Sequence, residues 1–301
     1  NKSLRIATRK SPLAYWQANS IKAQLEKIFP FLTITLLPLL TEGDRRQGSL
    51  NKLEGKGLFV KELEMALLEG RADIAVHSMK DLPMDLQQGL VLGAICKRED
   101  PRDVLIAKSN QALNQLLPGA YVGTSSLRRQ SQLMALRPDL RIALLRGNVG
   151  TRLEKLAAGE FDAIILAAAG LIRLEKVDCI SQYLETSYFL PAPGQGDRDS
   201  LAYISELTHR PTYYCVIAER VLSRELGGSC QVPIAAYATF LPGKQISLQA
   251  LVGKPDGTVL IKVEKQGAIC DAEKLGILAA QNLKELGVDA ILQDILTKKS
   301  N

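Results

Sequence analysis

The sequence predicts an α/β protein built from two α/β domains of similar construction and a small third domain of the α+β class. Two observations carry this prediction. Short apolar strands alternate with helices over the first two thirds of the 301 residues, which is typical of parallel sheets with crossover helices. In addition, ELEMALLEGRADIAVH and RLEKLAAGEFDAIILA share one plan: a helix, a capping glycine, two residues, an aspartate and an apolar strand. One larger sheet is the alternative interpretation.

The first part of the chain predicts three strands and two helices. Ser11 and Pro12 open the first helix, because proline is favoured in the first helical turn. Gly70 closes the second helix, since glycine is the usual residue just past a helix end. The strands are LRIAT (4–8), ITLLPL (34–39) and ADIAVHS (72–78), and the second helix is KELEMALLEG (61–70).

The middle part repeats this alternation, and Gly159 ends its second helix. The predicted strands are YVGTS (121–125), RIALLRG (141–147) and FDAIILAAAG (161–170), and the helices are SLRRQSQLMALR (126–137) and TRLEKLAAG (151–159).

The last third, from about Glu219, has a different order of elements. One helix precedes three strands, a Pro-Asp-Gly turn at 255–257 separates the second strand from the third, and the end is helical. The predicted elements are the helix AERVLSREL, the strands VPIAAYATF, QISLQALVGK and VLIKVEK, and the helical stretch 271–296. This order predicts the small α+β domain.

Composition excludes several classes of protein. Hydrophobic residues make up 46% and charged residues 23%, as in soluble globular proteins, and no apolar run approaches the ~18 residues of a membrane span. The N-terminus NKSLRIATRK lacks the apolar stretch of a signal peptide, so we expect a cytoplasmic protein with no membrane partner. Scattered cysteines without a CxxC pair, and only His77 and His209 as histidines, argue against a disulfide scaffold, a metal site and a Ser-His-Asp triad.

The positive charge is unevenly distributed. The net charge is +6, and arginines gather between positions 128 and 152 with Asp139 as the only acid among them. This cluster predicts a patch that attracts an anion, and a solvated surface is the alternative. No aromatic residue lies in that stretch to stack on bases, so a nucleic-acid partner is not expected. The arginines are Arg128, Arg129, Arg137, Arg141, Arg146 and Arg152.

Two stretches place polar residues where a strand ends and a helix begins, GTSSLRRQ (123–130) and LLRGNVGTR (144–152). Backbone N–H groups and hydroxyls at a helix start bind anions, and guanidinium forks suit carboxylates and phosphates. Neither stretch is a P-loop or a GxGxxG motif. Two such sites predict a polyanionic ligand, whereas ordinary helix capping with two surface arginines is the alternative for the first.

A third stretch, HSMKDLPMDL (77–86), follows a predicted strand directly. Lys80 and Asp81 therefore lie at a carboxyl edge, where open α/β sheets bind their ligands. A carboxylate there can move protons or stabilise a developing cation. The alternative is an N-cap or turn aspartate before Pro83.

Two further segments are predicted to be loops. TEGDRRQGSLNKLEGKGLF (41–59) is long enough for Lys52, Lys56 and Phe59 to fold over a site as a lid, although a purely flexible loop fits equally. In ELGGSCQVPIAA (225–236), Cys230 stands among glycines and a proline, which favour an open turn. Its thiol is therefore reachable from outside, unlike that of most structural cysteines.

Several long motifs together resemble one family, in the expected order and over most of the chain. They are IATRKSPLAYWQA, KGLFVKELEMALLEGRADIAVHSMKDLP, REDPRD, GTSSLRRQSQL, LRGNVGTRLEKL, DAIILAAAGLIRL, PAPGQG and GGSCQVPIAAYA. On these motifs the chain resembles the porphobilinogen deaminases, or hydroxymethylbilane synthases. The resemblance implies two domains like those of type II periplasmic binding proteins and a small third domain. It implies a monomer divided into residues 1–97 with 191–208, 98–190 and 209–301.

The resemblance also implies an activity. Such a transferase joins four porphobilinogen molecules into the linear tetrapyrrole hydroxymethylbilane in haem biosynthesis, with release of ammonia. The implied cofactor is a dipyrromethane, joined by a thioether to Cys230, made from two substrate molecules and used as a primer. Asp81 matches the catalytic aspartate, which would hydrogen-bond pyrrole N–H groups and stabilise the cation formed as ammonia leaves.

The resemblance further implies two groups of binding residues, whose cations and hydrogen-bond donors would pair with the carboxylates of the cofactor and the substrate. Those implied for the cofactor are Cys230, Lys80, Asp81, Thr124, Ser126, Arg128, Arg129, Arg146, Gly147 and Asn148. Those implied for the substrate are Arg9, Ser11, Gln17, Arg146, Arg152 and Arg173.

Two places depart from the family pattern. DRDSLAYISEL follows Gly196 where the family continues into an apolar strand, so we expect that this strand, which would return the chain to the first domain, is lost. The 41–56 loop is about one residue short.

A small-carboxylate-binding protein, or the effector domain of a regulator, is the second hypothesis. It would explain the two anion sites at strand ends, but it leaves Cys230 and Asp81 without a purpose. Because one fold hosts many functions, the fold alone does not decide between them.

Overall fold

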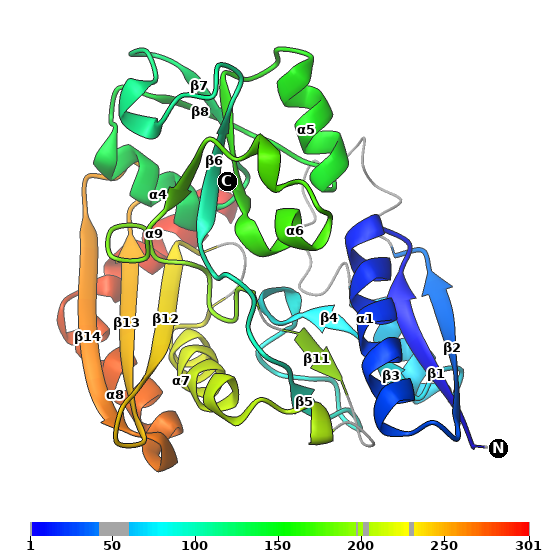
Figure 1. The fold of residues 1–301 in the computed structure, drawn as a ribbon. Helices are drawn as coiled ribbons and strands as arrows, with labels where there is room; N and C mark the ends of the chain where they lie inside the picture. Colours follow the sequence, from blue (N-terminus) through cyan, green and yellow to red (C-terminus); the bar gives the residue numbers. More distant parts are fainter. Residues whose placement is uncertain (1, 42–59, 197, 201–204, 229–231, 301) are drawn as a thin grey trace.

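The computed structural model describes residues 2–41, 60–196, 198–200, 205–228 and 232–300. Its strands and helices form two α/β regions and a third region with a separate three-stranded sheet (Figure 1). The predicted fold class is therefore confirmed.

The first α/β region has a parallel sheet in the order β2-β1-β3. Pro12 occupies the first turn of helix α1, and Ser11 caps it, since Ser11 Oγ accepts a hydrogen bond from the backbone N–H of Ala14 (3.4 Å). The elements are β1 (Lys2–Arg9), α1 (Pro12–Ile28), β2 (Leu32–Leu39), α3 (Lys61–Leu68) and β3 (Ile74–Ala75). The cap confirms the predicted helix start.

A small antiparallel sheet, β4-β11-β5, lies next to this region. The expectation that the strand after Gly196 is lost is wrong, because a three-residue strand lies there, between β4 and β5. The polar sequence DRDS does not predict this strand. It forms nevertheless because a strand pairs through its backbone N–H and C=O groups whatever its side chains are. The strands are β4 (His77–Ser78), β5 (Ala94–Ile95) and β11 (Arg198–Ser200).

The second α/β region has a mixed sheet in the order β10-β6-β9-β7-β8. Strand β7 is parallel to β8 and β9, as predicted, but β6 runs antiparallel to β9 and β10. The predicted strand 161–170 ends at Ala167 and continues as a helix, because the following Ala-Ala-Gly-Leu stretch lies beyond the edge of the sheet. The strands are β6 (Asp103–Ala107), β7 (Tyr121–Gly123), β8 (Arg141–Ala143), β9 (Ala163–Ala167) and β10 (Gln182–Leu184). The helices are α4 (Leu127–Leu136), α5 (Val149–Ala157) and α6 (Ala168–Arg173).

The third region is an antiparallel sheet, β12-β13-β14, packed against helices α7 and α8 (Figure 1). Helices α7 and α8 approach closely at Gly276, where a Cβ would lie 2.6 Å from the Ala218 carbonyl oxygen. The elements are α7 (Arg210–Glu225), β12 (Ile234–Leu241), β13 (Gln245–Gly253), β14 (Leu260–Ala268), α8 (Ala272–Glu285) and α9 (Val288–Ser300). This order confirms the predicted α+β class.

One buried carboxylate connects the third region to both segments that run between the α/β regions. Glu219, on α7, is fully buried, and its Oε1 lies 2.8 Å from Arg98 Nη1. The backbone N–H groups of Gly194 and Ala238 donate to its two oxygens at 2.7 and 2.8 Å. Arg98 follows β5 and Gly194 precedes β11, so Glu219 ties both connections to α7.

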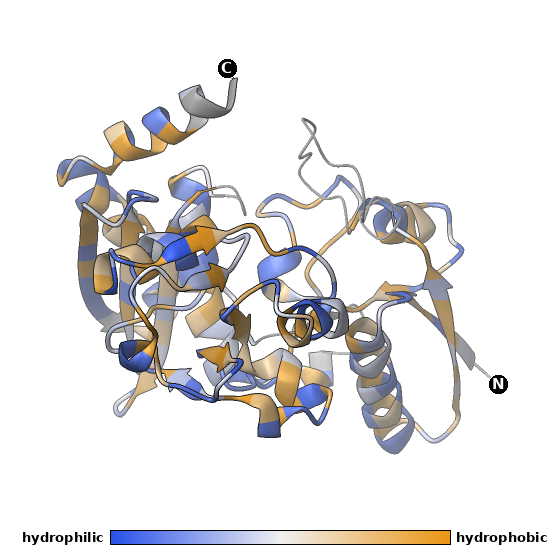
Figure 2. Ribbon diagram, turned by 90° about the horizontal axis from the view of Figure 1, so that it is seen from above, coloured by the Kyte–Doolittle hydropathy of each residue, from blue (hydrophilic) through white to orange (hydrophobic). Residues whose placement is uncertain are grey.

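The helices carry hydrophilic and hydrophobic residues along their length (Figure 2). Within the part of the chain that is described, none of them is long and apolar enough to cross a membrane.

Candidate active site

A small cavity of about 50 Å³ lies where β1 and β4 end. Gln17 is buried, and its Nε2 donates a hydrogen bond to Ser78 Oγ at 2.9 Å. Four residues predicted from the sequence, Arg9, Ser11, Gln17 and Asp81, line this cavity together. The others that line it are Leu13, Ala14, Val76, His77 and Ser78. The carboxyl edge of the first region is thus a polar pocket that contains Asp81.

His77 is neutral in this cavity at pH 7. Burial lowers its pKa to about 4; the carboxylate of Asp81 opposes this shift, and the positive charge of Arg9 adds to it. A neutral imidazole adds no positive charge, so the cations of the site are its arginines and lysine.

The second region contributes an arginine pair around a buried carboxylate. Arg128 Nη1 lies 2.7 Å from Asp103 Oδ2. Arg129 donates to Asp103 Oδ1 from Nε at 3.0 Å and from Nη2 at 2.7 Å. The carbonyl oxygens of Leu190 and Ile165 accept from Arg128 and Arg129, respectively. Burial alone would raise the pKa of Asp103, but the two guanidinium groups hold it well below its usual range.

Lys80 connects the cavity with the arginine pair. It belongs to a single 3₁₀ turn, Met79–Asp81, that follows β4. Its pKa is lowered to about 8, first by burial and then by the positive charge of Arg129, against the opposing effects of Asp81 and Asp103. Charges shift one another's pKa strongly only at short range, so the sequence-predicted Lys80, Asp81 and Arg129 form one site.

Arg152, from helix α5, belongs to the same site. Its pKa is lowered to about 10, first by burial and then by the positive charge of Arg129, against the opposing effect of Asp81. Arg152 Nε donates to the Gly147 carbonyl at 2.7 Å, which holds the guanidinium beside the turn at the start of α5.

The two predicted helix starts are built as expected. Ser126 caps α4 by accepting from the Arg129 N–H at 3.4 Å, and Thr124 Oγ1 accepts from the Ser126 N–H at 3.2 Å. Asn148 caps α5, since its Oδ1 accepts from the Thr151 N–H at 2.9 Å. Gly147 has a φ of 116°, and a Cβ there would lie 2.8 Å from Thr151, so glycine is required at this turn.

Arg146 and Arg173 lie at different depths. Arg146 is half-buried just after β8. Arg173 is buried at the end of α6, donates from Nη2 to the Gly196 carbonyl at 2.7 Å, and has its guanidinium 5.9 Å from the centre of the Trp16 ring. Arg173 thus contacts the segment that leads to β11, and its role toward a substrate stays a prediction.

Some sequence-predicted residues lie outside the described ranges, namely Cys230, Lys52, Lys56 and Phe59. Conversely, the sequence analysis missed Asp103, although REDPRD was among the recognised motifs. Its signal was an aspartate directly before the apolar run VLIA, where a buried charge needs a partner. In the described ranges no group of three or more His, Cys, Asp or Glu could hold a metal ion.

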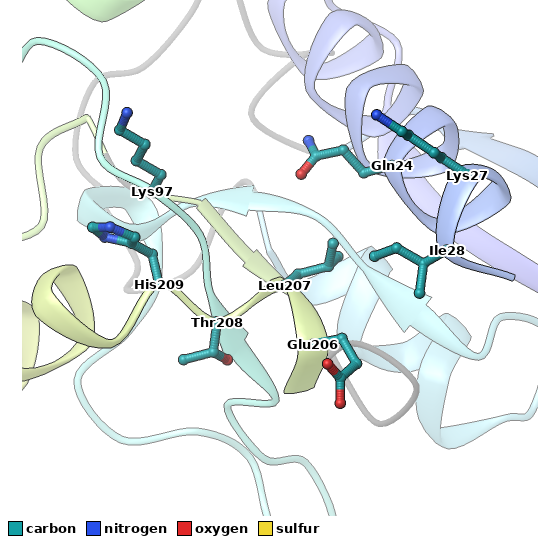
Figure 3. A pocket seen from close by; sticks show the side chains of 8 residues that line it. All are labelled: Gln24, Lys27, Ile28, Lys97, Glu206, Leu207, Thr208 and His209. Atoms are coloured by element: carbon teal, nitrogen blue, oxygen red, sulfur yellow. The ribbon is translucent and has the colours of Figure 1, made fainter.

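A larger open cavity, of about 530 Å³, shares no lining residue with the Asp81 cavity. Figure 3 shows Gln24, Lys27 and Ile28 of α1 on one side and the segment 206–209 on the other. None of the sequence-predicted site residues lines it, so the candidate active site stays at Asp81.

Two family models match most of the chain. Residues 4–197 match the porphobilinogen deaminase, dipyromethane cofactor binding domain, and residues 213–285 match the porphobilinogen deaminase, C-terminal domain. The first match contains Asp81, the arginine pair and both helix starts. The predicted family is therefore confirmed.

Similarity to solved structures is weaker. The VFT2 domain of BvgS from Bordetella pertussis has 14% identity and a TM-score of 0.40, covering 66% of this chain and 79% of that chain. The aliphatic sulphonate binding protein SsuA from Escherichia coli has 15% identity and a TM-score of 0.39, covering 74% and 70%. HinK, a LysR family regulator from Pseudomonas aeruginosa, has 14% identity and a TM-score of 0.41, covering 69% and 65%. At these values the likeness carries no argument about the site.

The family matches span both α/β regions and most of the third region, and they include the side chains gathered around Asp81. This chain belongs to the porphobilinogen deaminase family, whose role is in tetrapyrrole biosynthesis.

Proposed function

We propose that this chain is a hydroxymethylbilane synthase, which joins four porphobilinogen molecules head to tail and releases ammonia with each condensation. The observation that carries the proposal is the group of cations around Asp81 and the arginine pair. We further propose that the protein is a cytoplasmic monomer that acts on a small molecule and binds neither nucleic acid nor a membrane.

The charge of the site fits pyrroles that carry carboxylates. Porphobilinogen has an acetate and a propionate side chain, so a growing chain adds two negative charges with each ring. Buried carboxylates require charged or hydrogen-bonding partners. Within the described ranges the two carboxylates Asp81 and Asp103 are outnumbered by five cations, which are Arg9, Lys80, Arg128, Arg129 and Arg152.

The same residues fit the dipyrromethane cofactor that the family model names. Lys80, Arg128, Arg129 and the capped turns at Ser126 and Asn148 would hold its carboxylates. When bound, the cofactor would supply the two pyrrole rings to which substrate units are joined. Cys230 is the proposed point of attachment.

Asp81 is the proposed catalytic residue. Its carboxylate lines the cavity and interacts electrostatically with His77, Lys80 and Arg152. As ammonia leaves porphobilinogen, positive charge develops on the pyrrole ring, and a nearby carboxylate stabilises that charge. Asp81 can also accept hydrogen bonds from pyrrole N–H groups and exchange protons with the reacting ring.

Besides the cofactor, Lys80 would pair with a carboxylate of the incoming porphobilinogen, so substrate binding should depend on pH through Lys80. Its pKa of about 8 means that it is charged at pH 7 and largely neutral at pH 9. Loss of one charged hydrogen bond weakens binding by about 1.5–3 kcal/mol, so the KM for porphobilinogen should rise by roughly tenfold or more between these pH values. Steady-state kinetics over this range measure the change.

Lys80→Arg is the control for this prediction. Arginine stays charged throughout the range, so its KM should be nearly constant from pH 7 to pH 9. A wild-type KM as flat as that of the arginine variant would contradict the role of Lys80.

The mass of the protein tests the proposed function directly. We expect an added mass of two condensed pyrrole units, and peptide mapping should locate it on the peptide with Cys230. The exposed Cys270 is the internal control and should be unmodified. A protein without the adduct should gain it on incubation with porphobilinogen.

Absence of the adduct after incubation would favour the second hypothesis, a carboxylate-binding protein. That alternative is supported by the same cation group, but it requires neither a modified Cys230 nor ammonia release. Ammonia measured in the incubation mixture separates the two, because only the synthase produces it.

A further inference from the structure

The carboxylate between Arg128 and Arg129 is more than a neutralising charge. Asp103 stands at the first position of β6, fully buried, and contacts both guanidinium groups. We propose that Asp103 is a positioning residue that selects the ligands of the arginine pair: it fixes the two forks and keeps small inorganic anions out.

The geometry explains the exclusion. Two adjacent guanidinium groups form a strong site for sulfate or phosphate. Here Asp103 Oδ1 accepts two N–H groups of Arg129, and Oδ2 lies 2.7 Å from Arg128 Nη1. The positive charge that would attract a small anion between the forks is therefore already paired with a protein carboxylate.

A larger ligand can still reach the pair. Each arginine has five N–H donors, and the contacts with Asp103 and the carbonyls of Leu190 and Ile165 use only part of them. Two arginines and one aspartate leave a net charge of +1. A carboxylate that is held in place by the rest of a bound pyrrole can accept hydrogen bonds from the remaining donors. A free anion would gain little binding energy from those donors alone.

Gln195 prevents Asp103 from moving aside. Its Nε2 donates to Asp103 Oδ1 at 2.9 Å and to the Pro101 carbonyl at 2.8 Å. Gln195 is buried in the segment before β11, and Pro101 lies in the segment before β6. Both connections between the α/β regions thus hold the carboxylate between the forks.

The test is sulfate binding by Asp103→Asn, measured as the thermal unfolding midpoint against sulfate concentration, with sodium chloride at matched ionic strength. A ligand that binds only the folded state raises the midpoint with the logarithm of its concentration once that concentration exceeds the dissociation constant. For Asp103→Asn we expect this rise to begin at a sulfate concentration at least tenfold below that needed by the wild-type protein. The matched control is Asp139→Asn, because Asp139 pairs with Arg137 at an exposed position after α4; it should respond like the wild type.

A folded Asp103→Asn protein with the sulfate response of the wild type would overturn the inference. If this variant unfolds at the assay temperature, Gln195→Met replaces it, since it keeps every charge but removes one donor to Asp103 and one acceptor from Arg128 Nη2. Its sulfate dissociation constant should fall about threefold, and an unchanged constant would count equally against the inference.

The inference rests on the proposed function only for the identity of the organic ligand. Incubation with porphobilinogen, followed by intact mass, separates the two. A wild-type protein that gains no adduct contradicts the proposed function, whatever the sulfate result. A second outcome would contradict the selectivity role alone. The wild-type protein gains the adduct, and the Asp103→Asn variant gains it as fast as the wild type does in 50 to 100 mM sulfate (about physiological ionic strength or above).

Discussion

Replacement of Asp81 by asparagine is expected to lower turnover by about 10²- to 10⁴-fold. Asparagine keeps the size of the side chain but has neither the negative charge that stabilises a cationic pyrrole nor a group that accepts a proton. The side chain is exposed at the end of its turn, and substitutions at such positions change stability by only about 0.5 kcal/mol. The loss should therefore appear in kcat, with folding retained.

The measurement is the rate of hydroxymethylbilane formation, together with the thermal midpoint of each variant. Asp85→Asn is the matched control, because Asp85 is an exposed aspartate four residues further along the same stretch and does not line the cavity. It should keep nearly full turnover. Equal rates for the two variants would remove Asp81 from the catalytic role.

Replacement of Glu219 by glutamine is expected to destabilise the protein by about 3–5 kcal/mol. The substitution leaves Arg98 with no countercharge on α7 and turns one acceptor into a donor that faces N–H groups of Gly194 and Ala238. A buried polar group that loses its partner keeps the full cost of its desolvation. Urea unfolding of purified proteins measures the change.

Glu225→Gln provides the matched control for this prediction. Glu225 belongs to the same helix and forms an exposed ion pair with Arg224 at 3.8 Å, so its loss should cost no more than about 1 kcal/mol. If Glu219→Gln were as stable as this control, the contacts of Glu219 with the two segments that connect the α/β regions would not contribute to the free energy of unfolding.

Local chemistry made much of the site predictable. Ser11, Ser126 and Asn148 cap helices where the sequence placed helix starts. Such caps depend on residues within three positions of one another. Arg9 ends β1 and Asp81 follows β4, and both line one cavity, as expected of residues at the carboxyl ends of strands.

Partners distant in the chain were not predictable in this way. Asp103 meets residues 25 to 92 positions away, Glu219 meets Arg98 121 positions away, and neither pairing has a local signal. Strand β11 escaped for a related reason, since its pairing partners are backbone groups of His77, Ser78, Ala94 and Ile95. The polar residue types of this segment therefore did not predict the strand.

The sequence by itself determined the α/β order of elements, the helix caps, the family and the residues around Asp81, because each depends on local spacing or on long motifs. Only the tertiary structure decided which charges neutralise one another. It placed Asp103 between Arg128 and Arg129 and made Lys80 a cation with a pKa of about 8. The reason is physical: burial and distance set electrostatic energies, and both arise only when segments far apart in the chain pack together.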